Sequence, residues 1–171
     1  MRNRLVLIAL ALSCAAAPAA PLEAQRLVSL NLGGGATLPL GNLADGADPG
    51  WHALAGLGIG SLMQPIGIRV EGAYNRFGGD ASADPVITSA TLNFTYRLPM
   101  TNSPVSPYLI TGWGAHWLDC SDAACDADQR FGGNAGLGMK FNVGLRGFIE
   151  SRFHWVTGKV RYVPVTFGIT L

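Results

Sequence analysis

The chain has 171 residues, which is enough for one domain and too few for two comfortable ones. Hydrophobic residues make up 49% of the chain and charged residues only 13%, a composition too apolar for a disordered protein. The formal net charge is +1 and no basic helix or arginine stripe is present, so the composition gives no reason to expect a nucleic-acid partner.

The first 25 residues have the pattern of a signal peptide. Arg2 and Arg4 precede an apolar run over residues 5–17, and small residues follow up to residue 24. The apolar run is shorter than the roughly 20 residues that a transmembrane helix needs. We therefore predict a cleaved signal peptide over residues 1–25 and a mature domain over residues 26–171. Cleavage near residue 20, or acylation of Cys14, is the alternative.

Two cysteines remain after this cleavage, Cys120 and Cys125. An exported chain reaches an oxidising compartment, so we predict a disulfide between them. Closing so short a loop stabilises by about 2 kcal/mol, which stiffens a loop rather than holding a fold together. A metal site needs more ligands than this pair offers, and His116 alone does not complete one, so we predict no metal site here.

The first half of the mature chain predicts four β-strands, over residues 27–38, 51–63, 66–77 and 86–98. Apolar and polar residues alternate with a period of two along each, and no sustained helical repeat is present. In the third strand, for example, Ile66, Ile68 and Val70 alternate with Arg69 and Glu71. This half is therefore predicted to be all-β.

The second half predicts four further strands, over residues 107–118, 130–141, 145–156 and 162–171. In the third of these, Ile149 and Phe153 alternate with Glu150 and Arg152. The predicted connections over residues 39–50, 78–85 and 119–129 are long, whereas those over 64–65 and 142–144 are short. Long and short connections alternate in membrane barrels, although the one over residues 99–106 is long for an inner turn.

Alternation alone does not say which face lies inside, because a soluble lipocalin-like barrel buries its apolar face and a membrane barrel exposes it. The apolar faces carry no charge except Arg76, at an outer strand end. An Arg or Lys at the bilayer midplane costs about 2–4 kcal/mol, so lipid would select such faces. All eight Asp residues fall in the predicted long loops, at one end of the barrel. These features favour a membrane barrel.

The polar faces carry ionised residues that can pair when enclosed together. We predict an interior polar network made of Arg69, Glu71, Arg97, Arg130, Lys140, Arg146, Glu150, Arg152 and His154.

Four segments carry a family resemblance: PYLITGWG over residues 107–114, FGGNAGLG over 131–138, FIESRFH over 148–154 and VTFGITL over 165–171. The mature chain resembles the outer-membrane β-barrel domain family, small eight-stranded barrels of the OmpA and OmpX type. The resemblance implies an eight-stranded antiparallel up-and-down transmembrane β-barrel in the bacterial outer membrane. It also implies outer-membrane lipid, lipopolysaccharide and the outer-membrane assembly machinery as partners of a monomer.

In that family the last strand resembles an assembly signal that ends in an aromatic residue, usually Phe. Here Leu171 stands at that place, with Ile169 and Phe167 behind it at the matching spacing. The resemblance therefore implies that this strand is the assembly signal, and recognition by the machinery is expected to be weaker than with a terminal Phe.

No catalytic site is predicted. Glu150 and His154 share the inward face of one strand, and we interpret them as a structural polar pair. Lipid A deacylase barrels resemble this region in placing a nucleophilic Ser two residues after a His. Here that position is Val156, followed by Thr157, so the nucleophile is missing. We predict a non-catalytic barrel with a structural or surface-interaction role, no cofactor and no bound metal.

Three alternatives remain at this stage: a narrow porin-like channel, a lipid A-modifying enzyme and a soluble lipocalin-like binder. Eight strands leave an interior barely wide enough for side chains, which favours a packed, salt-bridged interior over an open pore. The Asp-rich segment over residues 119–128 invites a Ca²⁺ site, but it lacks the spacing of an EF-hand loop. A solvated acidic loop is the expectation.

Overall fold

The computed structural model describes residues 28–60, 65–79, 84–100, 103–120, 128–142 and 144–171. The predicted signal peptide and Cys125 lie outside the described residues, so the cleavage and the disulfide stay predictions.

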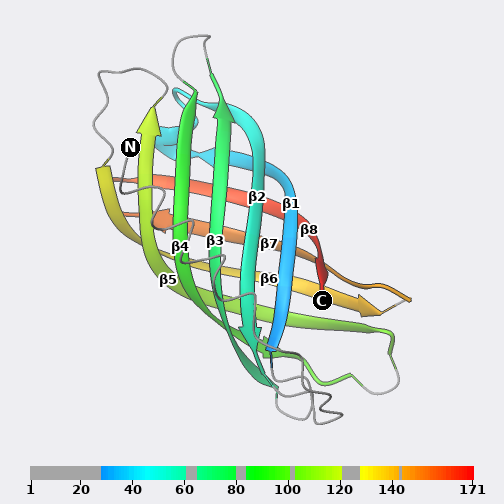
Figure 1. Ribbon diagram of the computed structural model, residues 1–171. Helices are drawn as coiled ribbons and strands as arrows, with labels where there is room; N and C mark the ends of the chain where they lie inside the picture. The colour runs from blue at the N-terminus through cyan, green and yellow to red at the C-terminus, as the bar shows by residue number, and fades with distance from the viewer. Residues whose placement is uncertain (1–27, 61–64, 80–83, 101–102, 121–127, 143) are drawn as a thin grey trace, which may run out of the picture.

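The eight strands form one closed antiparallel barrel in which each strand pairs with its neighbour in sequence and β1 pairs with β8 (Figure 1). The predicted eight-stranded up-and-down barrel is confirmed. In chain order the elements are β1 (Val28–Leu40), the 3-10 turn η1 (Gly41–Leu43), β2 (Asp48–Ile59), β3 (Ile66–Gly78), β4 (Pro85–Arg97), β5 (Val105–Cys120), β6 (Asp128–Asn142), β7 (Arg146–Val156) and β8 (Val160–Thr170).

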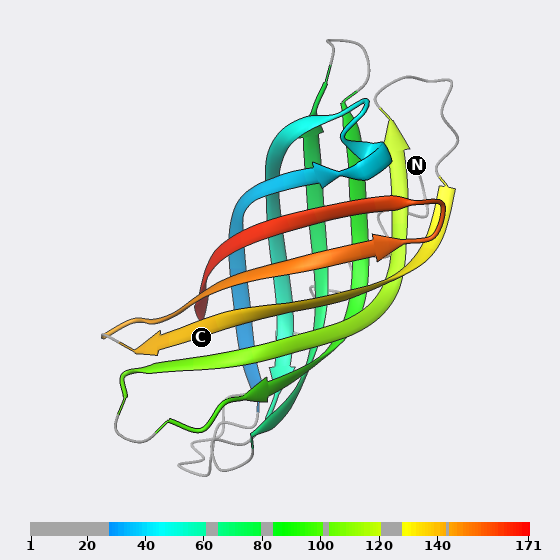
Figure 2. The same ribbon diagram turned by 180° about the vertical axis from the view of Figure 1, so that it is seen from behind.

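The start of β1 and the end of β8 lie at the same end of the barrel (Figure 2). The backbone N–H of Leu171 donates to the carbonyl of Leu30 over 2.8 Å, so the last residue lies beside the start of β1. Following the predicted orientation, we call this the inner end and the opposite end the outer end. At the outer end β7 and β8 are joined by a tight turn in which Gly158 and Lys159 both have positive φ, of 83° and 66°. Two consecutive residues with positive φ match the twist of a short hairpin.

The strands run further at the outer end than the sequence indicates. Asp48 begins β2, Asp119 lies within β5 and Asp128 begins β6, so the prediction that every Asp lies in a loop is wrong for these three. Leu118 and Asp128, for example, are still paired across β5 and β6. Backbone pairing continues above the apolar zone because it does not depend on which side chains the strand carries.

The barrel wall is apolar outside and polar inside. In β3, Ile68 and Val70 are exposed, whereas Arg69 and Glu71, which alternate with them, are each 3% exposed. Leu137 on β6 is 66% exposed, although a water-soluble barrel would bury such a residue. The predicted orientation of the two faces is therefore confirmed, and the exterior is the kind of surface that lipid covers.

Aromatic side chains pair along this exterior. The rings of Trp51 and Tyr74 lie 5.4 Å apart, and those of Phe153 and Trp155 lie 6.0 Å apart. Within the described part of the chain, no helix is long and apolar enough to cross a membrane.

Candidate functional site in the barrel lumen

Small residues make room in the lumen for large polar ones. A Cβ on Gly112 would lie 2.2 Å from Oδ1 of Asn93, and one on Gly138 would lie 2.4 Å from Cζ of Tyr108. The glycines of the inward faces therefore allow side chains from neighbouring strands to reach the barrel axis.

Four ionised side chains form a lattice across the middle of the lumen. Arg69 and Glu71 come from β3, and Glu150 and Arg152 come from β7, four strands away in the closed barrel and hence on the opposite wall. Each of the four side chains is at most 6% exposed. We call this set the ion-pair lattice.

Every Arg of the ion-pair lattice contacts both Glu residues. Arg69 Nε lies 2.8 Å from Glu71 Oε1, and Arg69 Nη2 donates to Glu150 Oε2 over 2.6 Å. Arg152 Nη1 lies 2.6 Å from Glu71 Oε2, and Arg152 Nε donates to Glu150 Oε1. Two positive and two negative charges therefore balance inside the barrel, which is the condition under which buried charges are tolerated.

Neutral residues of the intervening strands extend the ion-pair lattice. Tyr108 Oη on β5 donates to Glu150 Oε2 over 2.6 Å, and Asn93 Nδ2 on β4 donates to Glu71 Oε2 over 2.7 Å. Asn134 Nδ2 on β6 donates to Asn93 Oδ1 over 2.9 Å. The network thus links every strand from β3 to β7. The predicted network did not include these three residues, although the alternation places each on a polar face.

On the outer side of the ion-pair lattice, buried histidines and Tyr162 fill the lumen. The rings of His154 and Tyr162 stack with centroids 4.5 Å apart, and His116 meets His154 edge-on at 5.9 Å. His52 Nε2 and Thr166 Oγ1 lie 2.8 Å apart.

An apolar cluster closes the outer end of the lumen. Buried side chains from several strands meet there with residues of the β1–β2 connection and the ends of β5 and β8. The members are Ala47, Phe77, Ile87, Val156 and Tyr162, with Leu43, Leu118 and Val160 packed against them. We call this set the outer cluster.

The structure does not bring all the predicted network residues together. The predicted pair of His154 and Glu150 is not formed. Arg69, Arg152 and Tyr108 donate to the two carboxylate oxygens of Glu150, and the His154 ring stacks on the ring of Tyr162 instead.

Arg130 also lies apart from the predicted network, at the outer rim. Its Nε donates to Asp128 Oδ2 over 2.8 Å and its Nη1 to the carbonyl of Thr157 over 3.3 Å. Because β6 begins at Asp128, Arg130 lies close to the outer end of the strand and far from the level of the ion-pair lattice.

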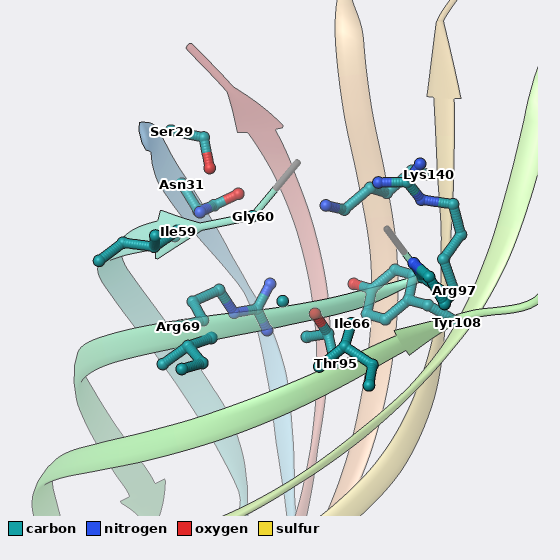
Figure 3. Close-up of a pocket in the computed structure, with 14 residues that line it drawn as sticks. Ser29, Asn31, Ile59, Gly60, Ile66, Arg69, Thr95, Arg97, Tyr108 and Lys140 are labelled. Atoms are coloured by element: carbon teal, nitrogen blue, oxygen red, sulfur yellow. The ribbon is translucent and has the colours of Figure 1, made fainter. Parts of the chain in front are cut away.

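Arg97, Lys140 and Arg146 lie at the inner end. They line a cavity of about 430 Å³, and a smaller recess of about 70 Å³ continues from Arg97 and Lys140 to Arg69. Figure 3 shows Arg69, Arg97, Lys140 and Tyr108 around this recess. Lys140 Nζ lies 5.6 Å from the centre of the Tyr108 ring.

The arrangement fills the middle of the lumen with paired charges. The carboxylates of the ion-pair lattice are held by cations. In the described ranges no three residues of the metal-binding types gather into a group that could hold an ion.

A closed eight-stranded barrel that has an apolar exterior, ionised residues in its lumen, and the start of its first strand beside the end of its last strand defines the class of small membrane-spanning β-barrels. The chain belongs to the outer membrane protein beta-barrel domain family, whose model matches residues 6–160.

Solved structures of bacterial outer-membrane barrels are similar in fold. Neisserial surface protein A matches with a TM-score of 0.71 and 16% identity, over 84% of this chain and 96% of that one. The attachment invasion locus protein Ail of Yersinia pestis matches with a TM-score of 0.54 and 17% identity, over 84% and 97%. The N-terminal barrel domain of Pseudomonas aeruginosa OprF matches with 0.53 and 15%, over 86% and 98%. At such identities the likeness shows the fold alone. No curated protein sequence matches the chain.

Proposed function

We propose that the protein is a non-catalytic, non-conducting barrel of the bacterial outer membrane that acts as a monomer through its outer surface. In this proposal it is exported by a cleaved signal peptide at residues 1–25, and the membrane assembly machinery inserts it by its last strand. The observation that carries the proposal is the closure of the lumen at two levels, by the ion-pair lattice and by the outer cluster.

The space between these two levels is too small for a permeating solute. The cavity bounded by His52, Glu71, Arg152 and His154 has a volume of about 20 Å³, enough for roughly one water molecule. A hydrated ion would have to displace the arginines of the ion-pair lattice and then the apolar side chains of the outer cluster. This supports a closed barrel over the narrow channel.

The surroundings of His154 support the absence of catalysis. Val156, at the position where the deacylase resemblance requires a nucleophile, is buried in the outer cluster. His154 itself is buried against Tyr162, so substrate has no path to it from the membrane.

A groove on the outer rim supports a surface role. It has a volume of about 750 Å³ and is lined by exposed Trp113, Phe131 and Trp155 beside the exposed cations Lys159 and Arg161. Aromatic residues favour the membrane interface, and cations above them suit phosphate groups. We call this the outer-rim groove and propose lipopolysaccharide as its partner, with acyl chains on the rings and phosphates at the cations.

Planar-bilayer recording of the purified protein tests the closed lumen. We expect no steady single-channel steps, because two independent layers block the path. Reproducible steps of uniform size in the parent protein would refute the closed barrel and establish the channel.

Lipopolysaccharide retained during purification tests the surface role. The double substitution Lys159→Gln/Arg161→Gln should lower the amount retained per barrel several-fold, since both cations of the outer-rim groove are lost. Arg76→Gln is the matched control, because Arg76 is also an exposed outer-end cation but pairs with Asp84 on another part of the rim. Equal retention in the parent and the double variant would contradict the proposed partner.

A further inference from the structure

The inner end of the lumen holds a cavity that the proposed surface role does not use. Its lining includes Arg97, Lys140 and Arg146 with the hydroxyls of Ser106 and Thr170. The smaller recess adjoining it is lined by Arg69, Thr95 and Tyr108 (Figure 3). We call the two together the inner vestibule. Its larger part, about 430 Å³, falls within the range of small-molecule sites, about 300–1,000 Å³.

The inner vestibule carries an excess of positive charge. The ion-pair lattice already balances Arg69 and Arg152 against the two glutamates. Lys140 and Arg146 are half-buried, yet neither forms an ion pair with a side chain in the described ranges. Among the residues that the structure describes, the lining contains no Asp or Glu.

The described aspartates lie elsewhere in the fold. Asp48, Asp119 and Asp128 are on the outer ends of β2, β5 and β6, and Asp84 directly precedes β4 at the same end. Lys140 and Arg146 are half-buried and line one cavity whose described lining holds no carboxylate side chain, so they repel each other and lose part of their hydration. An anionic ligand would relieve both costs.

We propose that the inner vestibule binds a phosphate-bearing ligand that enters from the inner end. Lys140 and Arg146 supply two positive charges, which a phosphate dianion balances and a single carboxylate does not. The guanidinium of Arg146 offers a planar fork that matches two phosphate oxygens, and the ammonium of Lys140 offers three N–H donors. The hydroxyl of Ser106 supplies a further donor to the remaining oxygens, whereas the hydroxyl of Thr170 already donates to Asn31 Oδ1.

The inner vestibule is a different site from the outer-rim groove, and ligand binding there does not depend on whether the lumen conducts. The ion-pair lattice lies between the inner vestibule and the outer end of the lumen. Binding at the inner vestibule therefore stands or falls independently of the proposed surface role.

The test uses the full barrel purified from membranes and has two arms. In the first, inorganic pyrophosphate is titrated calorimetrically into the protein in neutral detergent. In the second, the protein is placed in phosphatidylcholine nanodiscs with and without phosphatidylglycerol, and headgroup binding is read out as ³¹P NMR line broadening. Saturable binding of pyrophosphate identifies a soluble ligand. Broadening of the phosphatidylglycerol ³¹P line without pyrophosphate binding identifies a lipid headgroup. Either result supports a phosphate site.

Charge-removing variants decide whether the inner vestibule is the site. We expect Arg146→Gln and Lys140→Gln each to weaken binding roughly tenfold, since each removes a charged hydrogen-bond donor. Arg76→Gln, at the outer end, should bind as the parent does. If the Lys140 variant does not fold, the Arg146 variant alone decides. Parent-like binding in the Arg146 variant, or no saturable binding of either probe to the parent, overturns the proposal.

Discussion

Replacing Glu150 by Gln is the sharpest test of the ion-pair lattice. Glu150 is 1% exposed and its two oxygens accept from Arg69, Arg152 and Tyr108. Gln has nearly the same volume, so packing is retained. The substitution removes the negative charge and puts an amide N–H₂, which is a donor, where an acceptor is required.

The expected cost is about 3–5 kcal/mol of unfolding free energy, the range for a buried ion pair that loses one partner. Three hydrogen bonds to a charged group, at about 1.5–3 kcal/mol each, would sum to more. The smaller figure is expected because Glu71 remains within reach of both Arg69 and Arg152 and shares their charge. Urea unfolding in lipid vesicles, followed by tryptophan fluorescence and by the gel shift of the folded barrel, measures the change.

Two further variants separate the lattice from general effects of charge. Asp128→Asn breaks an exposed ion pair with Arg130 and should cost at most about 1 kcal/mol. Glu150→Gln combined with Arg152→Gln leaves a neutral Arg69–Glu71 pair, so the double variant should be more stable than the sum of the single changes predicts. A Glu150→Gln barrel within about 1 kcal/mol of the parent would refute the assignment of stability to the lattice.

Other predictions concern the wall, the lumen and assembly. Leu137→Arg places a guanidinium on a 66%-exposed position of the lipid-facing wall, and it should lower unfolding free energy in vesicles by about 2–4 kcal/mol. Gly138→Ala puts a Cβ 2.4 Å from Cζ of Tyr108 and should cost about 1–3 kcal/mol in the same assay. Gly72→Ala, whose Cβ meets nothing nearer than 3.9 Å, should remain close to the parent. Leu171→Phe gives the last strand the aromatic end that the family resemblance implies for the assembly signal. It should raise the folded fraction in outer membranes at equal expression, as measured by gel shift.

The barrel and the orientation of its faces could be predicted because both follow from a local property. A period of two along β3 sets Arg69 and Glu71 on one face and Ile68 and Val70 on the other, whatever the rest of the chain does. The absence of charge on the apolar face then decides which face meets lipid. No long-range information is needed for either step.

The height of each inward residue along the barrel could not be predicted in the same way. Alternation put Arg130 and Arg152 on the inward face alike, yet one lies at the outer rim and the other in the ion-pair lattice. Height depends on where each strand begins and on the stagger between neighbours, which closure of the whole barrel fixes. Glu150 and His154 are four residues apart on β7, which is roughly 13 Å along a strand, so their failure to pair could be predicted from the spacing.

The layers of the lumen determine where this barrel can meet other molecules. The ion-pair lattice cross-links opposite walls and the outer cluster seals the end above it, so both rims are held by a rigid middle. Binding at the outer-rim groove can affect binding at the inner vestibule through the network of β3 to β7 or along β7 and β8, which line both sites. Sites that share no partner contribute additively, so variants of Lys159 and of Arg146 should not change each other's effects. Coupling between them would mean that either the ion-pair lattice or the β7–β8 pair has two arrangements and not one.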